Sequence, residues 1–122
     1  MDGRKPRVLF VDDDVIERKV VELTLKGAFQ VTVIGSGTDA LKLLADEPYD
    51  CLLVDMRMPD LDGDEVIRRG TALQPDIRPV VLSAYIDGER ASELESRGIP
   101  FVKKPFQPHL LLQTLLQALS IE

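Results

Sequence analysis

The sequence predicts an α/β fold in which a five-stranded parallel sheet is covered by helices on both faces. Short runs of apolar and β-branched residues alternate with longer segments whose apolar residues recur at helical spacing. The short runs are almost continuously apolar, which is typical of strands buried on both faces of a parallel sheet. Apolar residues make up 44% of the 122-residue chain and charged residues 30%. This composition is that of a globular domain with a core of its own.

Two patterns define the individual elements. Continuous apolar and β-branched runs predict strands, and apolar residues spaced three or four positions apart predict helices. After an N-terminal tail at residues 1–6, the predicted elements in chain order are strand 8–11, helix 15–26, strand 31–34, helix 38–46, strand 51–54, helix 64–73, strand 80–82, helix 89–97, strand 99–102 and helix 108–119. In the first helix, Ile16, Val20 and Leu23 share one face, and in the second Leu41 and Leu44 do so. The run at 99–102 is the weakest of the five strands.

Residues at the ends of these segments support the assignment. The residues expected to cap helix N-termini are Asp14, Thr38 and Asp87. The glycines expected near helix ends are Gly27, Gly70 and Gly98, and Gly63 marks the turn into the third helix.

Charge and composition exclude several classes of protein. The net charge of -6 argues against direct nucleic-acid binding, which needs clustered basic residues. The single cysteine, Cys51, cannot form an internal disulfide and is expected to be a buried apolar residue. No apolar stretch approaches the ~20 residues of a membrane span. We therefore expect a cytoplasmic protein without membrane contact, in which residues 1–122 form a single domain and no output domain is present.

Polar residues gather where the predicted strands end. The residues that follow these strands are Asp12, Asp13, Asp14, Asp55, Ser83, Lys103 and Lys104. Each has an ordinary explanation as a helix cap, a turn residue or a solvated side chain. The carboxyl ends of parallel strands share one edge of a sheet, however, and ligands of open α/β sheets bind at that edge. The combination favours a functional site over capping alone.

The chemistry of these residues suits phosphoryl transfer. Crowded carboxylates repel one another unless a cation intervenes, and an all-oxygen site prefers a hard divalent ion, Mg²⁺ or alternatively Mn²⁺. A carboxylate attacks a phosphoryl group only when the negative charge of the equatorial oxygens is neutralised. The metal, the Lys104 ammonium and the Ser83 hydroxyl together supply that neutralisation.

The chain resembles the receiver domain of two-component response regulators. The resemblance covers almost the whole chain, and the residues that carry it are Val11-Asp12-Asp13, the segment DMRMPDLDG from Asp55, Ser83-Ala84 and Lys104-Pro105-Phe106. It implies a flavodoxin-like, doubly wound, three-layer fold with strand order 2-1-3-4-5 and five helices. It also implies a cis peptide bond between Lys104 and Pro105.

The resemblance further implies a role for each site residue. Asp55 would accept phosphate from the phosphohistidine of a sensor histidine kinase or phosphotransfer protein. The implied Mg²⁺ ligands are Asp12, Asp13, Asp55 and the backbone carbonyl of Arg57. Ser83 and Lys104 would bind the phosphoryl group, and Ser83 would act with Phe101 as a switch. Such a domain catalyses only its own phosphorylation and dephosphorylation.

The implied signal leaves through the surface formed by the fourth helix, fifth strand and fifth helix, towards a downstream effector or output domain. The last helix carries more apolar residues than one buried stripe requires, which also suggests a homodimer through this helix. Arg57 and Tyr85 match positions where the family varies and where side chains tune access of hydrolytic water. His109, the only histidine, has no expected partner acid and no expected role in phosphotransfer.

Two alternatives remain open at this point. The segment GSGTDA at residues 35–40 matches the dinucleotide-binding pattern G-x-G-x-x-A, although it follows the second strand and not the first. An aspartyl-phosphate phosphatase of the haloacid dehalogenase type would also combine an aspartate, a serine and a lysine with Mg²⁺. Such a phosphatase, however, uses a second acid two residues after the nucleophile, where this chain has Arg57.

Overall fold

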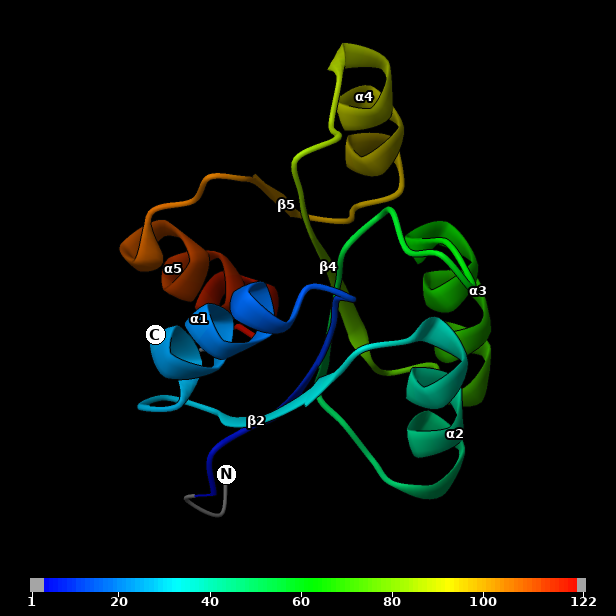
Figure 1. Ribbon diagram of the computed structural model, residues 1–122, viewed down its shortest axis with the longest axis vertical. Helices are drawn as coiled ribbons and strands as arrows, with labels where there is room; N and C mark the ends of the chain where they lie inside the picture. Colours follow the sequence, from blue (N-terminus) through cyan, green and yellow to red (C-terminus); the bar gives the residue numbers. More distant parts are fainter. Residues whose placement is uncertain (1–3, 121–122) are drawn as a thin grey trace.

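Within residues 4–120, five strands and five helices alternate along the chain (Figure 1). The computed structural model describes residues 4–120, so residues 1–3 of the expected tail and Ile121 lie outside the described residues. The elements are β1 (Arg7–Val11), α1 (Val15–Leu25), β2 (Gln30–Ile34), α2 (Gly37–Asp46), β3 (Cys51–Val54), α3 (Gly63–Leu73), β4 (Arg78–Ser83), α4 (Gly88–Ser96), β5 (Phe101–Lys103) and α5 (Pro108–Ala118).

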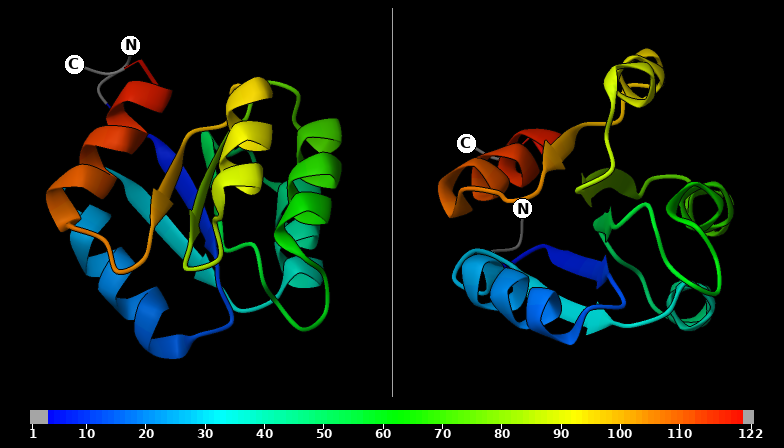
Figure 2. Two further views of the ribbon diagram at one scale, coloured as in Figure 1. Left: turned by 90° about the horizontal axis from the view of Figure 1, so that it is seen from above. Right: turned by 45° about the horizontal axis from the view of Figure 1, so that its top comes forward.

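The sheet is parallel throughout, with strand order β2-β1-β3-β4-β5. Helices α1 and α5 lie on one face of the sheet, and α2, α3 and α4 lie on the other (Figure 2). The predicted flavodoxin-like, three-layer fold is therefore confirmed. None of the helices within residues 4–120 is long and apolar enough to cross a membrane.

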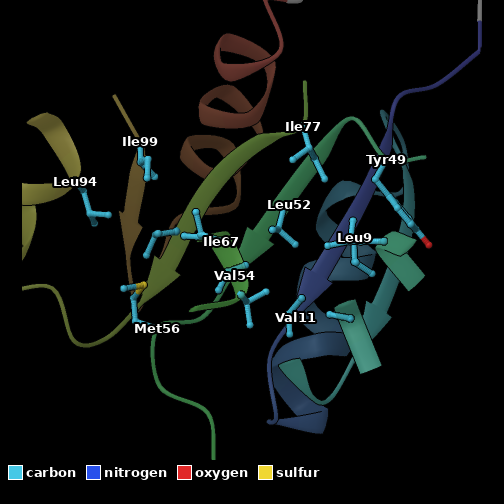
Figure 3. Close-up of a cluster of buried hydrophobic side chains, with 14 of the residues drawn as sticks. Leu9, Val11, Tyr49, Leu52, Val54, Met56, Ile67, Ile77, Leu94 and Ile99 are labelled. Atoms are coloured by element: carbon cyan, nitrogen blue, oxygen red, sulfur yellow. The ribbon is translucent and has the colours of Figure 1, made fainter. Parts of the chain in front are cut away.

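Alternate residues of each central strand enter two separate cores, one on each face of the sheet. In β1, Leu9 and Val11 point towards α2 and α3, where they join Leu52 and Val54 of β3 (Figure 3). The intervening residues of both strands pack against α1 and α5 on the other face. Cys51 belongs to this second core and is fully buried, and burial raises the pKa of its thiol to about 12. It is a buried apolar residue, as predicted.

Two of the three predicted helix caps are confirmed. Asp14 Oδ1 accepts hydrogen bonds from the amides of Ile16 and Glu17, and Asp87 accepts one from the amide of Arg90. The prediction of Thr38 was wrong, because Ser36 caps α2 through its hydroxyl, which accepts from the Asp39 amide at 3.0 Å.

The structure confirms one of the glycines expected near helix ends and corrects another. Gly98 follows the C-cap of α4 with φ +69°, a conformation that favours glycine. Gly70, expected near a helix end, lies inside α3. A Cβ there would meet the side chains of Leu44 and Leu52 at 3.0 Å, so this glycine allows close packing of α3 on the sheet.

The fifth strand begins two residues later than predicted. The strand begins at Phe101, and Ile99 is a buried residue of the preceding turn. Strand β4, in contrast, extends beyond the apolar run to include Arg78, Pro79 and Ser83.

Candidate functional site

Three carboxylates meet at the carboxyl edge of the sheet. Asp12 and Asp13 follow β1 and Asp55 follows β3, and these strands pair so that Val11 lies opposite Val54. One carboxylate oxygen from each of the three acids lies within 4.8 Å of the others. Asp12 and Asp55 are buried, whereas Asp13 is exposed. The predicted convergence of these acids is present in the structure.

Three hydrogen bonds, two to its backbone and one to its side chain, hold Asp12 in place. Its amide donates to the Ile34 carbonyl at 3.1 Å, and its own carbonyl accepts from Arg18 Nη1 at 2.8 Å. Its Oδ1 accepts from the Asp14 amide at 3.0 Å. These bonds leave Oδ2 as the atom of Asp12 that faces the rest of the site.

Lys104 reaches into this acidic group from the end of β5. Its Nζ lies 2.8 Å from Asp12 Oδ2 and 3.8 Å from Asp55 Oδ2. Burial alone would lower the pKa of Lys104, but the hydrogen bond to Asp12 and the nearby charges of Asp12, Asp55 and Glu17 raise it above its usual value. The side chain is therefore a charged ammonium at neutral pH.

Two further predictions for this segment are confirmed. Lys103 is exposed, as expected for a solvated side chain. The Lys104–Pro105 peptide bond is cis, as the resemblance implied.

Asp55 is a buried acid with an unused acceptor. Its Oδ1 has no hydrogen-bond partner within residues 4–120 and is fully shielded from solvent. Burial raises the pKa of Asp55, while the charge of Lys104 opposes that shift. A buried carboxylate oxygen without a partner is costly, and a divalent cation shared with Asp12 and Asp13 would satisfy it. The three acids are thus consistent with a divalent-metal site.

Ser83 and Phe101 lie on neighbouring strands of the sheet. Ser83 is fully buried at the end of β4, where its hydroxyl accepts from the Tyr85 amide at 3.1 Å. It pairs with Lys103 in the β4–β5 register, and Phe101 pairs with Val81. Phe101 is half-buried and packs against the core beneath α2, α3 and α4.

A model of the response regulator receiver domain family matches residues 8–116. The chain belongs to this family. Receiver domains are signalling modules of two-component systems, so the predicted resemblance is confirmed.

Curated relatives of this receiver domain are longer proteins. It is 34% identical over 116 residues to the hydrogenase transcriptional regulatory protein HoxA of Bradyrhizobium diazoefficiens, covering 93% of this chain and 24% of that protein. It is 31% identical over 115 residues to the transcriptional regulatory protein ZraR of Escherichia coli, covering 93% and 26%. The receiver domain therefore spans about a quarter of these relatives.

Solved receiver domains share its architecture. The receiver domain of DrrB in its BeF3-activated form has a TM-score of 0.85 at 26% identity, covering 95% of this chain and 98% of that one. A CheY-like receiver domain from Methanospirillum hungatei has a TM-score of 0.87 at 23% identity, covering 95% and 94%. The second likeness concerns the fold alone.

The structure adds contacts that the sequence did not reveal. The guanidinium carbon of Arg57 lies 4.0 Å from the centroid of the Tyr85 ring, so the loops that follow β3 and β4 are joined by a cation–π contact. Glu17 of α1 approaches Lys104, with its Oε1 3.9 Å from Nζ. The sequence carried no signal for the Glu17 contact, because Glu17 lies on helix α1 and not at the end of a strand.

Proposed function

We propose that this receiver domain accepts a phosphoryl group on Asp55 from the phosphohistidine of a sensor histidine kinase or phosphotransfer protein, with Mg²⁺ as the metal and Mn²⁺ as a substitute. The observation that carries the proposal is the environment of Asp55. This acid is 7% exposed, has a free Oδ1, and lies between two further acids and the Lys104 ammonium. Metal ligands, a cation and a carboxylate nucleophile are thereby combined in one site.

The reaction forms one bond and breaks one. A carboxylate oxygen of Asp55 attacks phosphorus, the phosphorus–nitrogen bond breaks, and its electron pair remains on the imidazole of the donor. The product is an acyl phosphate, which carries one more negative charge than the carboxylate. Asp12, Asp13, Asp55 and the backbone carbonyl of Arg57 would hold the metal, which supplies neutralising charge at the phosphoryl oxygens.

Lys104 and Ser83 act on the remaining oxygens. The Lys104 ammonium has to shift its interaction from Asp12 towards the phosphoryl group, a change supported by its position 3.8 Å from Asp55 Oδ2. The Ser83 hydroxyl, which now accepts from the Tyr85 amide, donates to a phosphoryl oxygen. That movement alters the loop leading to α4 and leaves space into which the Phe101 ring turns.

The altered surface is that of α4, β5 and α5, which contacts a downstream effector or output domain. A homodimer through α5 remains a prediction, but the expected apolar surplus is smaller than the sequence suggested. Leu111 and Leu115 are fully buried. Leu110 is the large apolar residue of α5 that is exposed to solvent, at 50%. The other leucines of the helix pack partly against the core.

The dinucleotide-binding alternative is disfavoured by the loop between β2 and α2. A phosphate cradle needs free backbone amides at the helix N-terminus. Here the Asp60 carboxylate accepts from the amides of Gly37 and Thr38, at 3.3 and 3.0 Å. These bonds lower the pKa of Asp60 to about 2, so the helix terminus already binds an anion of the chain itself.

Beryllofluoride binding tests the proposed function. Titration with beryllofluoride and Mg²⁺, followed by ¹⁹F NMR, should show a saturable complex with the wild type and none with Asp55→Asn. Asp39→Asn, an exposed change on α2, serves as the control and should bind like the wild type. Retention of binding by Asp55→Asn would contradict the assignment of the phosphoacceptor.

A further inference from the structure

Glu17 is a fourth acid of the site and contacts the Lys104 ammonium. It lies in the first turn of α1, and its side chain is 24% exposed. Its Oε1 is 3.9 Å from Lys104 Nζ, the same atom that lies 2.8 Å from Asp12 and 3.8 Å from Asp55. One ammonium is therefore shared among three carboxylates.

A structural role in helix capping does not account for this position. Glu17 is the third residue after the N-cap Asp14, where a glutamate commonly accepts a hydrogen bond from the N-cap amide. In this protein the Asp14 amide donates to Asp12 Oδ1 at 3.0 Å. The Glu17 carboxylate therefore does not cap the helix, and within residues 4–120 it forms an ion pair with Lys104.

The other acids of the site affect the pKa of Glu17. Burial raises its pKa, the charge of Lys104 lowers it, and the charges of Asp12, Asp14 and Asp55 raise it further, with a net upward shift. The interaction with Asp55 is reciprocal, because two like charges repel each other equally. An added negative charge on Asp55 is therefore opposed by Glu17.

We propose that Glu17 is a positioning residue that holds Lys104 away from the phosphoryl group and so restrains phosphorylation of Asp55. This inference rests on the proposed function. Before transfer, Glu17 and Asp12 draw the ammonium towards α1. During transfer, the ammonium must leave them for the phosphoryl oxygens, while the Glu17 charge repels the anionic donor. Both effects slow the reaction.

The test compares wild type with Glu17→Gln and with Glu22→Gln. Glu22 is a matched control, because it lies on the same helix, pairs with Lys19 at 3.5 Å and undergoes the same change of charge. The measurement is the rate of labelling by acetyl phosphate at saturating Mg²⁺ and low ionic strength. Glu17→Gln is expected to react about three to ten times faster than wild type, from the loss of one nearby charge. The difference should shrink in high salt, and Glu22→Gln should react like the wild type.

A second readout separates positioning from a purely structural effect. The pKa of the Lys104 ammonium, followed by ¹⁵N NMR of Nζ, should fall in Glu17→Gln, because one of the carboxylates that raise it is lost. Glu17→Asp keeps the charge and should label nearly as slowly as the wild type. Circular dichroism checks the fold, and Glu17→Ala repeats the change of charge if Glu17→Gln is unstable.

Labelling of Glu17→Gln at the rate of Glu22→Gln, or more slowly, would overturn the role of Glu17. Absence of labelling at Asp55 in the wild type would instead overturn the proposed function. The two failures are thus distinguishable.

Discussion

Lys104 makes its short ion pair with Asp12, at 2.8 Å, and stands 3.8 Å from Asp55. The ammonium neutralises the more deeply buried carboxylate and at the same time lies within reach of the other. A single side chain therefore stabilises the site and, in the proposed reaction, lies close enough to Asp55 to act on it.

Replacement of Lys104 should affect both stability and reaction. Asp12 is 1% exposed and would lose its cation in Lys104→Met, so the free energy of unfolding is expected to fall by about 3 kcal/mol in EDTA. Labelling by acetyl phosphate should slow about 100-fold because a charge-stabilising group is lost. Urea unfolding and mass spectrometry measure the two effects. Lys103→Met, at the exposed neighbouring position, should change neither; an equal effect of both variants would contradict the assignment.

The raised pKa of Asp55 predicts a pH-dependent stability. A carboxyl group whose pKa is raised on folding favours the native state at low pH and loses that contribution as pH rises through the folded-state pKa. Without divalent cations, Asp55→Asn should therefore be more stable than wild type at pH 7, by on the order of 1 kcal/mol. The gain should disappear towards pH 4. Thermal unfolding in EDTA across this range measures it, and addition of Mg²⁺ should stabilise the wild type only. A constant difference at all pH values would argue against a buried ionised Asp55.

Helix α4 should be the helix that separates most easily from the rest of the fold. Its single fully buried residue is Leu94, and Arg90 of the helix and its C-cap Arg97 pair with Asp64 of α3 at 2.5 and 3.1 Å. Burial alone would raise the pKa of Asp64, but these arginines hold it below its usual value. The stabilisation is present above the ordinary carboxyl pKa and is lost as pH falls through the lowered one.

Asp64→Asn should accordingly increase hydrogen exchange across α4 while leaving β1 and β3 protected. A loss of about 1 kcal/mol in local stability is expected, since the ion pairs are partly exposed. Glu65→Gln provides the control, because Glu65 pairs with Arg68 and Arg69 within α3 itself. Equal exchange of α4 in the two variants would show that Leu94, and not the ion pairs, holds the helix.

Gly63 should tolerate no side chain. A Cβ at this position would lie 2.6 Å from the Asp55 carbonyl oxygen and 2.8 Å from the Met56 Cα, and neither backbone atom can move without displacing the site. Gly63→Ala is expected to lose about 1–3 kcal/mol of stability and to bind beryllofluoride weakly. At Gly88, the first residue of α4, a Cβ meets nothing within 4 Å. Gly88→Ala should behave like the wild type in both assays, and similar losses in the two variants would contradict the steric argument.

The sequence predicted those parts of the site that follow from strand direction. Asp12 and Asp55 follow apolar runs, and parallel strands bring such positions to one edge. Strand ends could not reveal a contact made from a helix face, such as that of Glu17 with Lys104. The Asp14 amide, which a glutamate at the third helical position commonly takes, donates to Asp12 Oδ1 here, so Glu17 is left to pair with Lys104.

Local patterns also misplaced features that long-range packing decides. Ser36 and Thr38 are both plausible caps by residue type, but the Ser36 hydroxyl accepts from the Asp39 amide, while the distant Asp60 accepts from the Thr38 amide. Gly70 was expected near a helix end, but it lies inside α3, where its lack of a side chain leaves room for Leu44 and Leu52. In α5, the number of leucines did not indicate how many are covered by the sheet.

The most direct test of the central claim is the site of covalent phosphorylation. After reaction with acetyl phosphate and Mg²⁺, intact mass spectrometry and peptide mapping should find one acid-stable, base-labile phosphoryl group per chain, located on Asp55. Asp55→Asn should remain unlabelled under the same conditions. Stoichiometric labelling of another residue in the wild type, or undiminished labelling of Asp55→Asn, would contradict the account.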